Sequence, residues 1–80
     1  MALASAPVYV IVDPGVVGYT PVLAAYPSRD EARPHLLALV TMSQDGVVQI
    51  REYVGRERKG TWDVRRRDGG VEVLVHRGRA

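Results

Sequence analysis

The sequence predicts an α+β fold, a two-layer sandwich in which one helix packs on a mostly antiparallel sheet of four or five strands. Three observations indicate this fold. Apolar and β-branched residues alternate in short segments. A capped, apolar helix pattern follows Ser28. Asp68-Gly69 is a preferred hairpin turn between two alternating segments. The expected order is strand, strand, helix and three further strands (β-β-α-β-β-β).

The size and composition of the chain are those of one small globular domain spanning residues 1–80. Apolar residues make up 46% of the chain and charged residues 25%, unlike a disordered chain. No cysteine is present that could form a disulfide or a thiolate metal site. Strand packing and self-association remain as sources of stability. We expect residues 1–6 to be a disordered or extended tail and residues 78–80 to be frayed.

The apolar segments are too short to enter a membrane. The longest run covers residues 7–12, whereas about 20 residues are needed to span a bilayer. Residues 1–6 hold no basic side chain ahead of this run, so no secretory signal peptide is expected. The absence of cysteine fits a reducing compartment. We therefore expect a cytoplasmic protein without a membrane partner.

Two strands are expected before the helix. In residues 8–12 the valines at the even positions share one face, and Tyr9 and Ile11 share the other. Because both faces are apolar, this strand is expected to be central. A second strand is expected at about residues 20–26. Pro21 donates no backbone hydrogen bond, so this strand is predicted to lie at a sheet edge or to begin after Pro21.

A helix is expected over residues 29–42. Ser28 is a favourable N-cap, and Glu31 follows at capping-box spacing. The apolar stripe consists of Ala32, Leu36, Leu37, Leu39 and Val40. Pro34 lacks a backbone N–H and is expected to kink the helix near its start if Ser28 is the cap. If Asp30 caps instead, Pro34 falls in the first turn, where it costs less.

The last three strands are expected at residues 47–54, 61–67 and 71–76, with a charged loop at 55–60. A turn at Asp68-Gly69 gives the expected register of the final hairpin, and the alternative turn at Gly69-Gly70 would keep the same faces. On one face the expected pairs are Trp62 with Val75, Val64 with Val73, and Arg66 with Val71. On the other face they are Asp63 with Leu74 and Arg65 with Glu72. The first face is predicted to be buried under the helix.

The second face of the sheet has no helix to cover it. We expect it to carry Tyr9, Ile11, Tyr53 and Leu74, with Arg65 beside them. An exposed apolar patch of this kind often marks an interface. These four residues are therefore the candidate protein interface, for another protein or for a second copy of the chain.

Basic residues are concentrated in the last three strands. Residues 51–80 hold nine basic and five acidic side chains, whereas residues 1–50 hold two and four. The candidate contacts to nucleic acid or to an acidic partner are Arg56, Arg58, Lys59, Arg65 and Arg67. Trp62 and Tyr53 could stack on bases. Acidic residues interleave with these cations, so a solvated, ion-paired surface is the alternative interpretation.

No catalytic, cofactor or metal site is predicted. His35 and His76 have no second ligand at metal-binding spacing. His76 could act as a lone base, but a solvated residue at a strand end explains it better. Asp13 follows an apolar strand, as some catalytic acids do, and turn initiation before Pro-Gly explains it better. No glycine-rich phosphate-binding motif is present.

The first half of the chain resembles small phage and prokaryotic α+β domains of unknown function. The resemblance lies in Val8-Tyr9-Val10-Ile11-Val12-Asp13, in residues 22–32, and in Ile50-Arg51-Glu52-Tyr53. It covers about residues 8–54 and implies no activity. The same region is similar to HicB-type antitoxins, whose first half is also strand-strand-helix. The Gly-Cys-x-x-x-Gly segment usual before their helix has no counterpart here.

The leading hypothesis is a small, non-enzymatic protein-interaction module of phage or mobile-element origin. Self-association through the uncovered face or an edge strand is part of this hypothesis, because added strands would enlarge a small core. One alternative is a nucleic-acid-binding protein that uses the basic C-terminal hairpin. Another is an enzyme whose site forms only in an oligomer. No cofactor is expected under the leading hypothesis.

Overall fold

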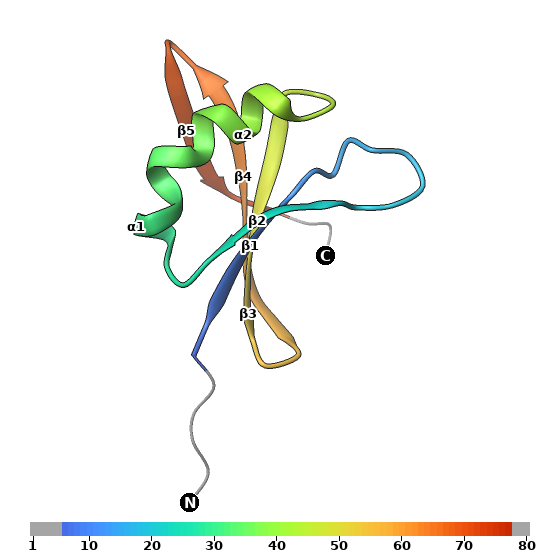
Figure 1. Ribbon diagram of the computed structural model, residues 1–80, viewed down its shortest axis with the longest axis vertical. Helices are drawn as coiled ribbons and strands as arrows, with labels where there is room; N and C mark the ends of the chain where they lie inside the picture. The colour runs from blue at the N-terminus through green and yellow to red at the C-terminus, as the bar shows by residue number, and fades with distance from the viewer. Residues whose placement is uncertain (1–5, 78–80) are drawn as a thin grey trace, which may run out of the picture.

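The computed structural model describes residues 6–77 and contains five strands and one interrupted helix (Figure 1). The elements are β1 (Val8–Val12), β2 (Val22–Tyr26), α1 (Arg29–Ala32), the 3₁₀ turn η1 (Arg33–His35), α2 (Leu36–Met42), β3 (Val47–Val54), β4 (Glu57–Arg67) and β5 (Gly70–Val75). The expected tail and frayed end fall outside the described residues, apart from the exposed Ala6. Between residues 6 and 77 no helix is long and apolar enough to cross a membrane.

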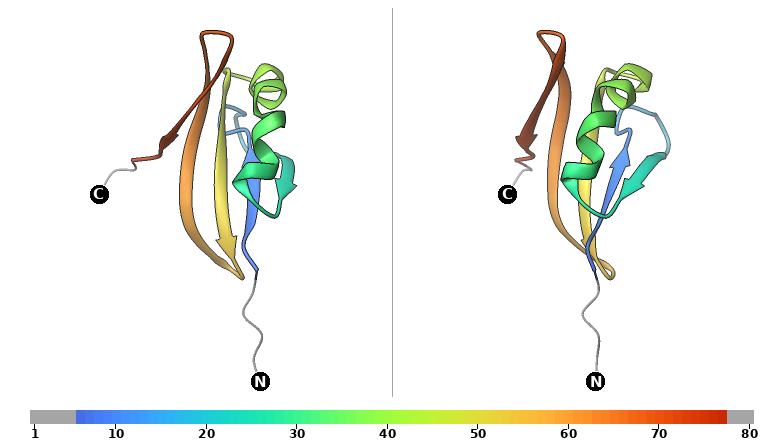
Figure 2. Two further views of the ribbon diagram at one scale, coloured as in Figure 1. Left: turned by 90° about the vertical axis from the view of Figure 1, so that its left-hand side faces the viewer. Right: turned by 60° about the vertical axis from the view of Figure 1, so that its left-hand side comes forward.

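The strands form one open antiparallel sheet in the order β2-β1-β3-β4-β5. The helical segment between β2 and β3 lies on one face of the sheet (Figure 2). This arrangement confirms the predicted α+β class and element order. β1 is an inner strand and β2 an edge strand that begins after Pro21, as the sequence predicts.

The helical segment follows its sequence signals. The Oγ of Ser28 accepts a hydrogen bond from the backbone N–H of Glu31 at 3.1 Å. Pro34 lies within η1, which separates α1 from α2. A 3₁₀ turn tolerates the missing N–H of proline at this point, so the predicted helix is interrupted without ending.

Ser28→Ala is expected to lower the free energy of unfolding by about 1 kcal/mol, because the N–H of Glu31 loses its acceptor. Urea unfolding followed by far-UV circular dichroism measures this loss. Ser28→Asp keeps a side-chain oxygen at the N-cap that can accept this hydrogen bond, and it should retain most of the stability. Equal stability of Ser28→Ala and the unaltered chain would contradict the assigned cap.

The C-terminal hairpin has the predicted register. Val64 lies opposite Val73, and Arg65 lies opposite Glu72. Asp68 and Gly69 have φ of 50° and 83°, the two positive values that a type I′ turn requires. Arg66 reaches the helix side, where it donates a hydrogen bond to Thr41 Oγ1.

The predicted charged loop at residues 55–60 is wrong. Val54 pairs with Glu57, so the chain reverses at Gly55-Arg56 and β4 begins at Glu57. Gly55 has φ of 62°, a value that suits glycine. β5 extends only as far as Trp62 in its pairing with β4. The first residues of β4 therefore form a free edge, where charged side chains can stay in solvent while the backbone pairs with β3.

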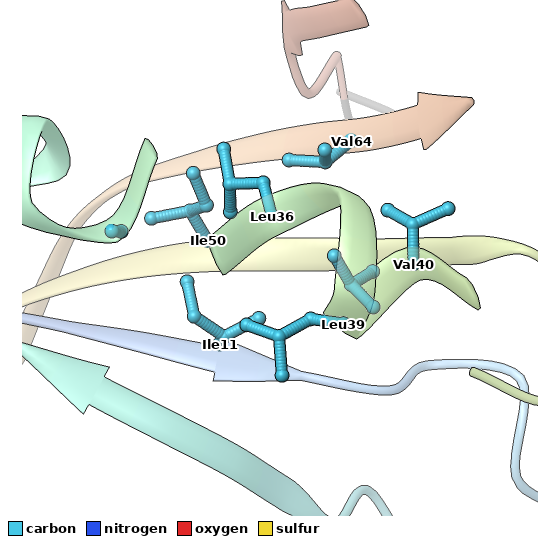
Figure 3. Packing of buried hydrophobic residues seen from close by; sticks show 8 residues of the cluster. Ile11, Leu36, Leu39, Val40, Ile50 and Val64 are labelled. Carbon is cyan, nitrogen blue, oxygen red and sulfur yellow. The ribbon is translucent and has the colours of Figure 1, made fainter. Parts of the chain in front are cut away.

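The core lies between the helical segment and the middle of the sheet (Figure 3). The buried residues that form it are Ile11, Ala32, Leu36, Leu39, Val40, Val48, Ile50 and Val64. β1, β3 and β4 contribute fully buried residues, and Leu23 and Ala24 of β2 pack against the cluster. This cluster fixes which face of the sheet is covered.

The predicted faces of Tyr9 and Ile11 are wrong. Ile11 lies directly opposite Ile50 of β3, and directly opposed residues share a face. Ile50 faces the helix, so Ile11 is fully buried and Tyr9 packs beside the core. On the opposite face of β1, Val8 is exposed and Val10 is half-buried, whereas Val12 is buried. Neither Tyr9 nor Ile11 belongs to an uncovered interface.

Val73 and Val75 lie on the predicted face without being buried. Their exposed fractions are 39% and 66%, whereas Val64 on the neighbouring strand is fully buried. β5 diverges from the helical segment, which covers β3 and β4 more closely (Figure 2). The prediction that Val73 belongs to the dry interior is therefore wrong, and an apolar surface remains open beside β5.

Candidate functional site

A groove runs between the helical segment and the β4–β5 hairpin. Its volume is about 470 Å³. The residues that line it are Arg29, Arg33, Leu36, Ile50, Trp62, Val71, Val73 and Val75. The lining is apolar apart from the two arginines, which come from the start of the helical segment. A groove of this kind suits apolar side chains of a ligand.

Trp62 is the largest side chain in the groove, and its position is tightly defined. A Cβ at Gly60 would lie 2.8 Å from Trp62 Cη2, so the indole needs glycine at that position. The guanidinium of Arg29 lies 4.4 Å from the ring centroid, within the range of a cation–π contact. The Tyr9 ring lies 6.3 Å away. Trp62 thus joins the helix start, β1 and the hairpin.

Tyr9 lies beside this site and takes no part in an uncovered face. Its hydroxyl donates a hydrogen bond to Glu52 Oε2 at 3.1 Å. Burial raises the pKa of Tyr9, and the hydrogen bond to Glu52 and the charge of that carboxylate raise it further. The phenol therefore stays neutral and serves as a donor that fixes Glu52.

Arg29 and Arg33 were not among the predicted site residues. They are four positions apart, which places them on one side of the helical segment, and this spacing is visible in the sequence. Arg33 forms an exposed ion pair with Asp30 at 3.1 Å, and such pairs contribute at most about 1 kcal/mol. Both guanidinium groups can therefore contact a polar group at the rim of the groove.

β5 forms the open side of the groove and an edge of the sheet. The N–H of His76 donates to the carbonyl oxygen of Thr61 at 2.9 Å. In an antiparallel pair, residues that hydrogen-bond to the partner strand through their backbone alternate with residues whose backbone groups point away from it. Val71, Val73 and Val75 therefore direct their backbone N–H and C=O groups toward the free edge.

Leu74 and Tyr53 lie on the uncovered face, as predicted, but far apart. Leu74 pairs with Asp63 and is 43% exposed. Tyr53 pairs with Val8 and is half-buried. Across the strands, Leu74 is level with Gln49 of β3, because Asp63 pairs with both. Gln49 and Tyr53 are four positions apart along β3, about 14 Å. The structure therefore does not join the predicted interface residues into one apolar patch.

A row of polar side chains separates these two residues. Gln49 Nε2 donates to Asp63 Oδ1 at 3.1 Å, and Gln49 Oε1 accepts two hydrogen bonds from Arg51. Asp63 Oδ2 lies 2.8 Å from His76 Nδ1. Among residues 6–77, no hydroxyl hydrogen-bonds to His76 and no cluster of metal-binding side chains occurs. These hydrogen bonds join the polar side chains of the row to one another.

The predicted basic contacts are divided between the two ends of β4. Arg56 lies in the turn just before β4, Arg58 and Lys59 lie near its start, and Arg65 and Arg67 lie near its end. Arg58 and Arg65 are seven positions apart along the strand, about 24 Å. Lys59 pairs with Glu57 at 2.6 Å, and both Arg65 and Arg67 contact Glu72. These cations form no single patch, and three of them have acidic partners.

Asp13 has a structural role. The side chain is buried, Oδ1 accepts a hydrogen bond from the N–H of Gly15 at 3.0 Å, and Oδ2 accepts one from the N–H of Gln44 at 2.8 Å. The first bond forms the turn that the sequence predicts. The second ties this turn to the segment after α2.

Comparison of the chain with protein-family models, with curated proteins and with solved structures found no match. The groove and the β5 edge are therefore interpreted from their own geometry and chemistry.

Proposed function

We propose that this chain is a non-enzymatic protein-interaction module that binds an extended protein segment along β5. The observation that carries the proposal is the free edge of β5. Natural sheets protect their edges with charged residues, prolines, bulges or covering segments. β2 at the opposite edge lies between Pro21 and Pro27, and its pairing with β1 shifts register between Ile11 and Val12.

β5 carries few of these protective features. Its sequence is Gly-Val-Glu-Val-Leu-Val, without proline or lysine, and its only charged residue is Glu72. The Glu72 carboxylate contacts Arg65 and Arg67 of the same chain. The backbone groups of Val71, Val73 and Val75 remain available to a further strand. An edge of this type favours pairing with another protein segment.

The groove gives such a segment a place for its side chains. In strand addition, backbone hydrogen bonds supply affinity, and pockets for alternate side chains supply specificity. Alternate residues of a strand beside β5 would lie on the helix side, next to Val73 and Val75. Trp62 supplies the kind of aromatic surface that is enriched at binding hot spots.

Blocking the β5 edge is expected to remove specific protein binding. Val73→Pro removes an outward N–H while keeping the bonds of its neighbours to β4, and Val75→Asp places a charge beside the groove. Immobilised variants are incubated with nuclease-treated lysate from the source organism, and retained proteins are quantified by mass spectrometry. Each variant should retain the specific partner at least about tenfold less than the unaltered chain.

Val17→Asp is the matched control for Val75→Asp, because Val17 is 94% exposed and lies in the loop between β1 and β2. This control should retain the same proteins as the unaltered chain. Circular dichroism establishes that all variants are folded. Identical protein sets on all variants would refute the proposal. A parallel incubation with lysate that has not been treated with nuclease tests the nucleic-acid alternative: retention seen only there, and falling steeply as salt rises, would support it.

A further inference from the structure

The exposed strand β5 has a nearly symmetric sequence. Residues 71–75 are Val-Glu-Val-Leu-Val, so valines lie at equal distances on either side of Val73. These valines are also the residues whose backbone groups point to the free edge, as the hydrogen bond from His76 to Thr61 establishes. A two-fold symmetric interface brings one patch against an identical patch. A symmetric strand meets that requirement.

One register allows two β5 strands to pair over this whole segment. Val73 then lies opposite Val73 of the second copy, and Val71 lies opposite Val75 of the second copy. The backbone groups of all these residues point to the free edge, so each pair can exchange both of its backbone hydrogen bonds. Glu72 lies opposite Leu74 of the second copy, and no like charges meet.

The neighbouring registers are less favourable. A shift by two residues in one direction places Glu72 opposite Glu72 of the second copy, and directly opposed like charges are destabilising. A shift in the other direction leaves only residues 73–75 of β5 paired. Registers that differ by one residue place outward-facing backbone groups opposite inward-facing ones.

Pairing in this register would also cover exposed apolar surface. Val73 and Val75 lie on the groove side of β5 with 39% and 66% of their surface exposed. The valines of a second β5 strand would lie directly beside them. Cross-strand contacts between β-branched side chains stabilise antiparallel pairs, and the groove would gain a second wall.

We infer that β5 pairs antiparallel with β5 of a second copy, with Val73 on the two-fold axis, to form one continuous sheet across two chains. This inference rests on the proposed function, because it names the segment that occupies the same edge.

Cysteine cross-linking tests both the association and the register. The chain has no cysteine, so each introduced thiol is the only one. Opposed residues in such pairs have Cα atoms about 5.5 Å apart, within the range of a disulfide. Under mild oxidation, Val73→Cys should form covalent dimers alone, whereas Val71→Cys and Val75→Cys should do so when mixed.

Val17→Cys gives the rate of cross-linking by random collision, because that residue is exposed in a loop remote in sequence from β5. The matched pairs should cross-link at least about tenfold faster, because pairing raises the effective thiol concentration. Sedimentation of the unaltered chain should give a dimer, and Leu74→Glu should shift it toward monomer because glutamates then face each other.

Three outcomes would overturn the inference: a monomer at all concentrations, cross-linking no faster than for Val17→Cys, or fastest cross-linking in a different residue combination. A monomer that still retains a protein from lysate in an edge-dependent manner would leave the proposed function standing and refute only the second copy as occupant. If the chain is monomeric and also retains no protein through the β5 edge, both proposals are refuted.

Discussion

Ile11→Ala is expected to lower the free energy of unfolding by about 2–5 kcal/mol, because truncation leaves a cavity that the core cannot fully close. Ile11 is fully buried between Ala24 of β2 and Ile50 of β3. A domain of this size has a total stability of only about 4–12 kcal/mol. The variant should therefore unfold at a much lower urea concentration, as measured by far-UV circular dichroism.

Val22→Ala is the control for this substitution, because Val22 is an exposed apolar residue on the neighbouring strand. Its effect should stay within about 0.5 kcal/mol. Similar small losses for Ile11→Ala and Val22→Ala would contradict the placement of Ile11 under the helix. They would instead fit the face that the sequence alone suggests for Ile11.

Asp13→Ala is expected to have the second-largest effect. It leaves the N–H groups of Gly15 and Gln44 without their carboxylate acceptor, and hydrogen bonds to charged groups contribute about 1.5–3 kcal/mol each. A loss of at least about 2 kcal/mol is expected. Urea unfolding measures the loss, and amide hydrogen exchange should show faster exchange at Gln44.

Asp30→Ala provides a matched substitution at an exposed aspartate, whose ion pair with Arg33 is open to solvent. Its cost should not exceed about 1 kcal/mol. If Asp13→Ala were as mild as Asp30→Ala, the two backbone hydrogen bonds at Asp13 could not have the proposed stabilising role.

Local signals predicted the elements that depend on neighbouring residues. Asp68-Gly69 closes its hairpin through adjacent residues, so the whole register of β4 with β5 follows from two positions. Ser28 and Pro34 likewise act within one turn of chain, and the cap and the 3₁₀ interruption occur where they indicate. The structure confirms the hairpin register and the Ser28 cap, and it has a 3₁₀ turn at Pro34, where a kink was expected.

Long-range pairing decided what the sequence left open. The alternation in β1 shows that Tyr9 and Ile11 share a face, but both faces are apolar, so it cannot show which one meets the helix. That choice depends on the pairing of Ile11 with Ile50, which are far apart in the chain. The candidate interface inherited this error at Tyr9 and Ile11.

The reach of the helix over the sheet was also beyond the sequence pattern. Val64 and Val73 have equivalent positions in the hairpin, yet only Val64 is buried, because β5 diverges from α2. This divergence opens the groove that Arg29 and Arg33 line. Charge likewise misled the prediction at residues 57–60, where a solvent-facing strand edge accepts the same residues as a loop.

The setting of Trp62 gives the protein a built-in optical probe. It is the only tryptophan in the chain, and its ring touches the guanidinium at the helix start and lies near the phenol of Tyr9. Indole fluorescence responds to polarity and to neighbouring groups. Its emission spectrum therefore reports, without any attached dye, whether three separate parts of the chain have come together.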